Sequence, residues 1–345
     1  MGTAAFAAGG LLGGCAAPSV FARKEPSFYN GALLHLGSNM WGDFPDDPDA
    51  CLDPFVGPEG KPVTYRSYLK CRDELWKRSV DRMAERKMNF VVIDCGEGIE
   101  YPSHPELQVK GTWSVEKTRR ELDRIRSLGM TPVPKLNFST CHDAWLKDYH
   151  RMVSTRKYYE VVADVIRDTC EIFDNPPYFQ VGMDEEGYKW CSGNAYCVYR
   201  GDDLWWHDIG FYGKCIEKHN ARPWMFSNPG TRDLDEFVKR LPKSFLQTPW
   251  SYAQQFELPT GDPDPDAGDR TKAFTRLAQE GFDLVPCGSV WVPRNLRETG
   301  LGLNIKNYPN LVRWFKKHVD PARVKGYFTA PWRKPVPEDQ QKTLD

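Results

Sequence analysis

The sequence lacks an excess of charge of either sign, because 46 Lys and Arg residues are balanced by 47 Asp and Glu residues. Binding to nucleic-acid phosphates needs basic residues concentrated on one surface, whereas here they are interspersed with acidic ones. The sequence also lacks an apolar stretch long enough for a transmembrane helix, which needs about 20 residues. We therefore expect neither a nucleic-acid partner nor a membrane-spanning segment.

Closely spaced cysteine pairs are missing too, although the chain has ten cysteines. Structural zinc sites usually have pairs of Cys or His ligands a few residues apart, so we expect no zinc site, and no motif indicates another cofactor. Cys191 with Cys197, and Cys51 with Cys71, are candidate disulfide pairs. Sequence alone does not determine disulfide connectivity, so both stay candidates.

Apolar and aromatic residues, in contrast, are plentiful. Apolar residues make up 40% of the 345 residues, and there are 12 Trp, 15 Tyr and 18 Phe. Aromatic rings pack in protein cores, and Trp faces also provide flat platforms for the C–H surfaces of sugar rings. The composition predicts a large folded core and leaves both uses of the aromatic residues open.

The first residues have features of an export signal. Residues 4–14 form an apolar run of small side chains that is too short to cross a membrane, and it leads to LGGC at residues 12–15. This ending resembles the lipobox of a bacterial lipoprotein, and residues 2–18 are similar to the tail of a twin-arginine signal. The resemblance implies an exported protein, periplasmic or attached to the cell envelope through lipidated Cys15. An unstructured chain end is the alternative.

Short β-rich segments alternate with longer amphipathic ones along the rest of the chain, which is typical of repeated strand–helix units and a parallel sheet. We expect residues 1–28 to be signal and linker, and residues 29–345 to be one α/β domain, a (β/α)8 TIM barrel of at least about 250 residues. The second half is less regular, so an incompletely closed barrel is one expectation. The predicted strands are residues 32–37, 89–94, 131–136, 178–183, 223–227, 244–248, 283–286 and 324–329. The predicted helices are residues 68–87, 114–128, 158–173, 204–219, 233–240, 271–280 and 311–319.

In such a barrel the active site lies at the carboxyl ends of the strands, so residues that follow each strand are candidates. They form a ring of acids and aromatic residues, and we expect Asp94, Glu97 and Asn137 to contact the substrate. The full set is Asp94, Glu97, Glu100, Asn137, His142, Asp143, Asp184, Glu185, Glu186, Trp250, Tyr252, Trp291, Arg294 and Trp332.

Asp184 and Glu185 are the most informative pair in this set. They end an otherwise apolar strand, where burial of ionisable groups is costly without a use. Successive side chains on a strand point to opposite faces, so both can face one site only if the strand end turns. We predict that one of them is a catalytic acid and the other its orienter; a helix cap or a surface acid is the structural alternative.

Residues 171–185 (EIFDNPPYFQVGMDE) resemble the strand-four motif of family 20 glycoside hydrolases, the β-N-acetylhexosaminidases, in which Gly-Gly-Asp-Glu follows a helix that ends in Glu-Leu-Phe. Residues 83–89 (MAERKMN) are similar to the family's passage into strand two. Residues 128–137 (LGMTPVPKLN), followed by His142, are similar to its third strand, and residues 326–332 (GYFTAPW) to its last. The resemblance extends over about residues 31–332.

The resemblance implies substrate-assisted hydrolysis, in which the sugar's own 2-acetamido oxygen replaces a protein nucleophile. Residues 283–289 suit this mechanism, because they supply no acid at the carboxyl end of strand seven. By this resemblance Glu185 is the general acid and base, Asp184 accepts the acetamide N–H, and His142 supports the pair. The resemblance also implies an acetamide pocket with Trp250, Trp291 and Trp332 as its walls. In this pocket Tyr252 donates a hydrogen bond to the acetamide oxygen. Core packing is the alternative for the aromatic residues, as is a structural role for His142.

Several departures from the family affect the expected substrate. Met183 replaces the second Gly before the Asp, Lys135 and Asn137 replace the acids of strand three, and residues 34–38 contain no Arg after strand one. The closing Trp-x-Glu reads WRK at residues 332–334. In the family that Arg and Glu hold sugar hydroxyls. We therefore expect a different, branched or modified glycan instead of simple terminal N-acetylglucosamine.

Two other functions stay open on the sequence. A non-catalytic carbohydrate-binding protein of the cell envelope, built on a degenerate barrel, is favoured by the missing Arg and Glu, whereas the retained Asp184 and Glu185 argue against it. A glycosidase that uses two protein carboxylates, with Glu97 or Glu100 as the partner of the acid, would be distinguished by the separation of its carboxyl groups.

Overall fold

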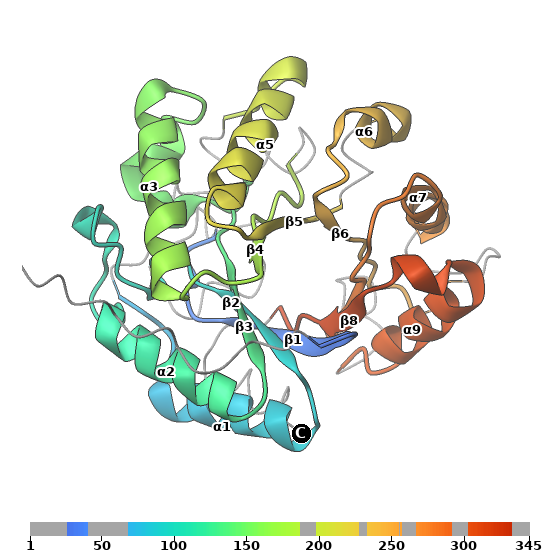
Figure 1. The fold of residues 1–345 in the computed structure, drawn as a ribbon, viewed down its shortest axis with the longest axis horizontal. Helices are drawn as coiled ribbons and strands as arrows, with labels where there is room; N and C mark the ends of the chain where they lie inside the picture. The colour runs from blue at the N-terminus through green and yellow to red at the C-terminus, as the bar shows by residue number, and fades with distance from the viewer. Residues whose placement is uncertain are drawn as a thin grey trace, which may run out of the picture.

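The computed structural model describes residues 26–40, 68–186, 198–227, 233–254, 256, 267–291 and 303–332. Within these ranges eight parallel strands form a barrel with helices around it (Figure 1), which confirms the expected (β/α)8 fold. The strands are β1 (Tyr29–His35), β2 (Phe90–Asp94), β3 (Thr131–Lys135), β4 (Tyr178–Gln180), β5 (Arg222–Phe226), β6 (Leu246–Thr248), β7 (Cys287–Gly288) and β8 (Gly326–Thr329). The α-helices are α1 (Asp73–Glu85), α2 (Val115–Ser127), α3 (Arg156–Ile172), α5 (Asp202–Glu217), α6 (Leu234–Arg240), α7 (Ala267–Gln279) and α9 (Asn307–His318). The 3-10 helices are η2 (Gly96–Gly98), η3 (Pro105–Leu107), η4 (Ala144–Arg151) and η6 (Pro321–Arg323).

The strands lie side by side in the order β6-β5-β4-β3-β2-β1-β8-β7. Hydrogen bonds from the Val285 N–H to the Gln247 carbonyl (2.9 Å) and from the Cys287 N–H to the Pro249 carbonyl (3.0 Å) join the two ends of this order. The barrel is therefore nearly closed, and the short β6 and β7 agree with the irregular second half that the sequence predicted. Residues 333–345, where an eighth helix would follow, lie outside the described residues.

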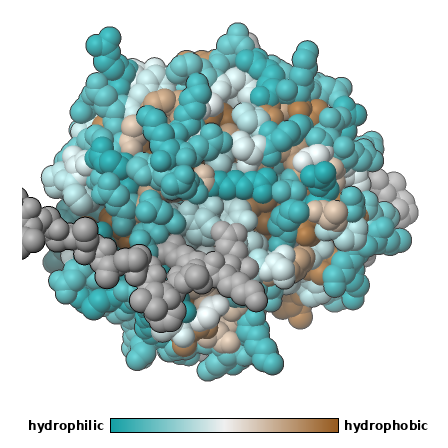
Figure 2. All heavy atoms as spheres, in the orientation of Figure 1, coloured by the Kyte–Doolittle hydropathy of each residue, from teal (hydrophilic) through white to brown (hydrophobic). Residues whose placement is uncertain are grey.

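Strand side chains alternate between the barrel interior and the surrounding helices. The apolar interior includes Tyr29, Leu33, Phe90, Val92, Val133, Trp224, Phe226, Leu246, Val285 and Phe328. The other strand faces pack on the helices, where Leu122 and Ile125 of α2 and Val161 and Val165 of α3 are buried at the spacing that predicted them. The outward helix faces are polar, and Figure 2 shows hydrophilic residues over most of the viewed surface, with hydrophobic ones in small separate areas.

Toward the carboxyl ends of β1 to β4, the inward positions change from apolar to polar. In the register of neighbouring strands, His35 pairs with Asp94, Asp94 with Lys135, and Lys135 with Gln180. All four side chains are buried. We call these four residues the polar layer, because they lie between the apolar interior and the candidate site residues that follow the strands.

Most predicted element boundaries agree with the structure to within a few residues, but those of strands four and seven differ. Strand seven was predicted at residues 283–286, whereas β7 is Cys287–Gly288. Strand β4 ends at Gln180, before the predicted Met183, because Gly182 and Met183 have positive φ values (71° and 70°) that cannot continue a strand. No sequence pattern predicted η4, whose backbone is kinked at Lys147, with φ 52° and ψ −128°.

The cysteines contradict one expectation. Cys71 is a free thiol, so the suggested bridge to Cys51 is wrong. Cys15, Cys191 and Cys197 lie outside the described residues, as does the whole segment that resembles an export signal. Among the helices that the structure describes, none combines the length and the apolar character needed to cross a membrane.

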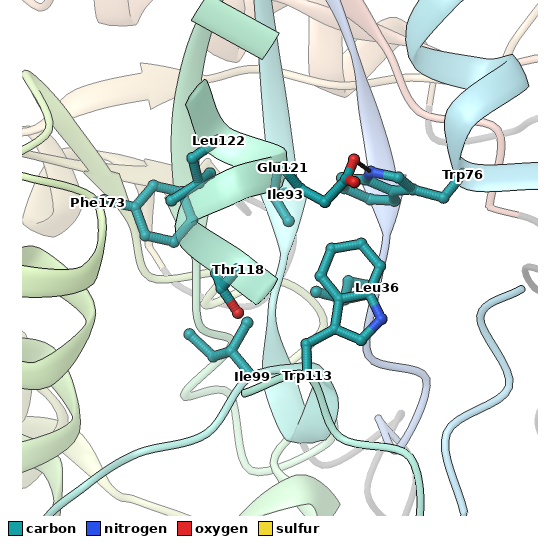
Figure 3. Close-up of a pocket in the computed structure, with 9 residues that line it drawn as sticks. All are labelled: Leu36, Trp76, Ile93, Ile99, Trp113, Thr118, Glu121, Leu122 and Phe173. Carbon is teal, nitrogen blue, oxygen red and sulfur yellow. Dashed lines mark hydrogen bonds between the residues drawn. The ribbon is translucent and has the colours of Figure 1, made fainter. Parts of the chain in front are cut away.

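A small void lies between the barrel and helices α1 and α2. It is a gap in the packing, too small to be a binding site. Figure 3 shows its mostly apolar lining, with Trp76 of α1 and Glu121 of α2 on one side. Its volume is about 10 Å³, which holds about one water molecule. Its polar groups already have partners: Trp76 Nε1 donates to Glu121 Oε2 (3.1 Å), and the Thr118 hydroxyl donates to the Ser114 carbonyl (2.9 Å).

Candidate active site

The backbone turns sharply after β4, and this turn decides how the two acids lie. Gly182, Met183 and Glu185 all have positive φ values (71°, 70° and 60°), which residues other than glycine rarely adopt. Asn137, two residues after β3, stabilises the turn by accepting the Met183 N–H at Oδ1 (3.2 Å) and donating from Nδ2 to Asp184 Oδ1 (2.8 Å). The strand end therefore does turn, as two neighbouring acids on one site require.

His142 lies between the two acids. Its Nδ1 is 3.5 Å from Asp184 Oδ1, and its Nε2 is 3.3 Å from Glu185 Oε2. The imidazole is buried and so is Asp184, whereas the side chain of Glu185 is 21% exposed. The structure thus brings together all three residues that the sequence predicted to be catalytic, with Glu185 as the member open to solvent.

Electrostatics favour a charged imidazole in this position. Burial alone lowers the pKa of His142, but the charge of Asp184 and hydrogen bonds with both acids outweigh it and raise the pKa to about 10. Burial likewise favours a high pKa for Asp184, yet the His142 charge and hydrogen bond, with Lys135 and Asn137, hold it well below its usual range. Near neutral pH the pair is an imidazolium beside an aspartate.

This pair predicts how stability depends on pH. Folding raises the pKa of His142 from 6.5 to about 10, so the imidazolium stabilises the fold fully below about pH 6.5, and the contribution is lost as the pH rises through 10. The low pKa of Asp184 keeps its own contribution intact above the ordinary value of 3.8. We expect His142→Gln to destabilise the protein most near pH 6, by about 4–5 kcal/mol at most, and much less at pH 10. Denaturant unfolding of both proteins at several pH values measures this; a difference independent of pH would contradict it.

The negative charge of Asp94 is balanced by basic side chains inside the polar layer. Its Oδ2 accepts a hydrogen bond from Lys135 Nζ (2.6 Å) and lies 3.3 Å from His35 Nδ1. Burial works against ionisation, but Lys135 and His35 together lower the pKa of Asp94. Lys135 is itself fully buried, so the lysine that departs from the family motif acts as the internal counter-ion of Asp94. The sequence carried a signal for this pair, because parallel register places Lys135 next to Asp94 at inward positions of neighbouring strands.

Glu97 and Glu100 are held by other parts of the protein. The Glu97 carboxylate is buried and accepts the backbone N–H groups of Ser38 (2.7 Å) and Asn39 (3.1 Å), which anchors the segment after β1. Glu100 accepts hydrogen bonds from Gln108 Nε2 (3.0 Å) and the Val115 N–H (3.4 Å). In this structure both carboxylates serve to fix loops at the carboxyl ends of β1 and β2.

Aromatic residues from the carboxyl ends of β6, β7 and β8 form one cluster around Tyr252. Its ring centroid lies 5.1 Å from that of Trp250, 5.7 Å from Trp291 and 6.4 Å from Trp332. Burial, with smaller contributions that include the charges of Glu185 and Asp184, raises the pKa of Tyr252 well above its usual value and keeps its hydroxyl a donor. The four predicted aromatic residues thus lie together, while Arg294 lies outside the described residues.

Within the part of the chain that the structure describes, the donor atoms of His142, Asp184 and Glu185 lie within 4.8 Å of one another, close enough to be considered as metal ligands. The two imidazole nitrogens face different carboxylates, however, and only one of them could reach a shared ion. The arrangement in the structure is an ion-pair bridge from one imidazole to two carboxylates.

The fold and the site together define a (β/α)8 barrel with acids and aromatic residues gathered at the carboxyl ends of its strands. No protein-family model matches the sequence, and no curated protein matches it. Among solved structures, the chain is similar to the family 20 β-N-acetylhexosaminidase of Streptomyces coelicolor A3(2), with a TM-score of 0.59 and 12% identity, over 91% of this chain and 61% of that one. It is also similar to Dispersin B, with a TM-score of 0.56 and 12% identity, over 92% of this chain and 96% of that one.

A third similar structure is the family 20 exo-β-N-acetylglucosaminidase of Vibrio harveyi, with a TM-score of 0.53 and 14% identity over 76% of this chain. This chain spans about half the length of that protein, covering 48% of it, and 48% of the chitobiase of Flavobacterium johnsoniae. At these identities the likeness shows the barrel fold. The family of these neighbours is the one that the strand motifs resemble.

Proposed function

We propose that this protein is a glycoside hydrolase that acts on a glycan containing a 2-acetamido sugar, by substrate-assisted retaining hydrolysis. The observation that carries the proposal is the bridge from His142 to both Asp184 and Glu185 at the carboxyl end of β4. A binding protein has little need for two acids of different exposure on one imidazolium. Two of the similar solved structures are a family 20 β-N-acetylhexosaminidase and a family 20 exo-β-N-acetylglucosaminidase, which supports the same substrate class.

Each acid suits a different step of that reaction. The more exposed Glu185 protonates the glycosidic oxygen as the acetamide oxygen attacks the anomeric carbon, and it later takes a proton from the attacking water. Asp184 stays ionised beside His142, so it can accept the acetamide N–H and hold that group in line. The aromatic cluster around Tyr252 supplies apolar walls and a hydroxyl donor.

The two-carboxylate mechanism has less support. Its candidate nucleophile Glu97 is 1% exposed, and its carboxylate is occupied by the N–H groups of Ser38 and Asn39. Glu100 is likewise held by Gln108 and Val115. Neither arrangement leaves a carboxylate free to attack a sugar, so the acetamide oxygen is the nucleophile that we propose.

A matched substrate panel tests the proposal. Aryl β-glycosides of N-acetylglucosamine and N-acetylgalactosamine are compared with the glucose and galactose analogues, alongside glycosaminoglycan, mucin and algal glycans that carry branched or modified sugars. We expect turnover of acetamido substrates only, and better turnover of the complex glycans. Equal hydrolysis of substrates without the acetamide would support the two-carboxylate mechanism, whereas binding without any turnover would support the carbohydrate-binding alternative.

A further inference from the structure

A fully buried arginine, Arg200, lies behind the candidate site. It donates to Glu186 Oε1 from Nε (2.7 Å) and to the Phe138 carbonyl from Nη2 (2.8 Å), and Nη2 also contacts the other oxygen of Glu186. From Nη1 it donates to the Tyr212 hydroxyl (2.6 Å) and to Asp208 Oδ2 (3.0 Å). These five hydrogen bonds use the five N–H donors of a guanidinium group.

The acceptors on one side of Arg200 belong to the two loops that carry the catalytic residues. Glu186 directly follows Glu185, and its Oε2 also accepts the N–H of Thr140 (3.2 Å). Phe138 and Thr140 belong to the loop after β3 that leads to His142, whose N–H donates to the Ser139 carbonyl (2.8 Å). Arg200 therefore joins the loop of residues 138–142 to the turn of residues 182–186.

On its other side Arg200 is anchored to the helices outside the barrel. Asp208 and Tyr212 lie on α5, and the Tyr212 hydroxyl pairs with the hydroxyl of Tyr158 on α3 (3.0 Å). Asp208 also accepts hydrogen bonds from the hydroxyls of Ser154 (2.6 Å) and Tyr159 (2.5 Å). The guanidinium is thus held by two packed helices while it holds two loops.

We propose that Arg200 is a positioning residue that sets the distance between His142 and Glu185 by clamping their two loops; this rests on the proposed function. The five hydrogen bonds described above join Arg200 to Glu186, Phe138, Asp208 and Tyr212, so it acts on His142 and Glu185 through Glu186 and the backbone. A planar guanidinium with five fixed donors transmits position in a way that a flexible lysine ammonium cannot. An error of about 1 Å in a catalytic group can cost about 100-fold in rate.

The test compares Arg200→Lys and Glu186→Gln with wild type. Both changes keep the approximate size of the side chain and weaken the clamp. We expect kcat on an acetamido substrate to fall about 10- to 100-fold with KM changed less than about twofold, because the substrate contacts are untouched. The matched control is Arg222→Lys, which alters an arginine that joins Asp283 (2.8 Å) and the Ser244 carbonyl (2.7 Å) at the opposite end of the barrel, and it should keep the wild-type kcat.

A second readout does not depend on activity. The NMR titration of His142 reports its contacts with the two acids, and we expect its pKa to move from about 10 toward the ordinary value in both variants and to stay in Arg222→Lys. If no substrate is ever turned over, this titration still tests whether Arg200 positions the two loops. Failure of the proposed function can therefore be told apart from failure of the positioning role. If Arg200→Lys does not fold, Glu186→Gln decides alone. Folded variants with wild-type kcat and an unchanged His142 titration would overturn the proposal.

Discussion

Glu185→Gln should lower kcat by about 10²- to 10⁴-fold on substrates whose leaving group needs a proton, because the variant side chain has no acidic proton to donate. The effect should be smaller on dinitrophenyl glycosides, whose leaving group departs without protonation. The amide can keep a hydrogen bond to His142 and has the size of the carboxylate, so the fold should persist. Steady-state kinetics on both kinds of leaving group, with circular dichroism for the fold, measure these effects.

Glu160→Gln provides the control for this change, because Glu160 is an exposed acid on α3 (56%) whose ion-pair partner is Lys157. It should leave the kinetics unchanged on every substrate. If Glu185→Gln turns over an active substrate at the wild-type rate, Glu185 is not the general acid, and the carbohydrate-binding function becomes the better explanation of the site.

Asp184→Asn should lower kcat on acetamido substrates by about 100-fold, because a neutral side chain cannot hold the acetamide in line for attack. The substitution also removes the negative charge next to His142, which should lower the pKa of the imidazole from about 10 toward its ordinary value. Substrates without the acetamide should be poor for wild type and insensitive to the change.

The ratio of kcat/KM for paired substrates with and without the acetamide measures this effect, and NMR of the imidazole measures the change in charge. An equal loss on both kinds of substrate would show that Asp184 acts only through the fold or through Glu185. The pair of results, for Glu185 and for Asp184, separates proton transfer from orientation of the substrate.

The barrel and the acidic pair could be predicted because both depend on local patterns. The segment 178–185 shows an apolar run followed by two acids, and the alternation of strands and helices fixes which end of the barrel those acids occupy. The position of Asp94 beside Lys135 also follows from parallel register, once inward positions are counted in steps of two. Both residues stand out in the sequence, but their pairing was not predicted.

The contacts made by the loops and turns that follow the strands could not be predicted. His142 meets both acids because Met183 and Glu185 adopt left-handed φ values, and nothing in the identity of these residues favours that conformation. Arg200 lies 14 residues after Glu186 and belongs to no motif, so only the folded chain shows that they pair. Tertiary contacts impose these arrangements against local preference, which is common at functional sites.

Gly182 provides a sequence marker for relatives of this protein. A Cβ at this position would lie 2.0 Å from Asn137 Oδ1, and its φ of 71° is unfavourable for any other residue. A relative that keeps the hydrogen bond from Asn137 to Asp184 must therefore keep a glycine two positions before the aspartate. An asparagine just after the third strand, combined with Gly-x-Asp-Glu after the fourth, is thus a search pattern that would collect the lineage of this protein and separate it from barrels with an acid in place of Asn137.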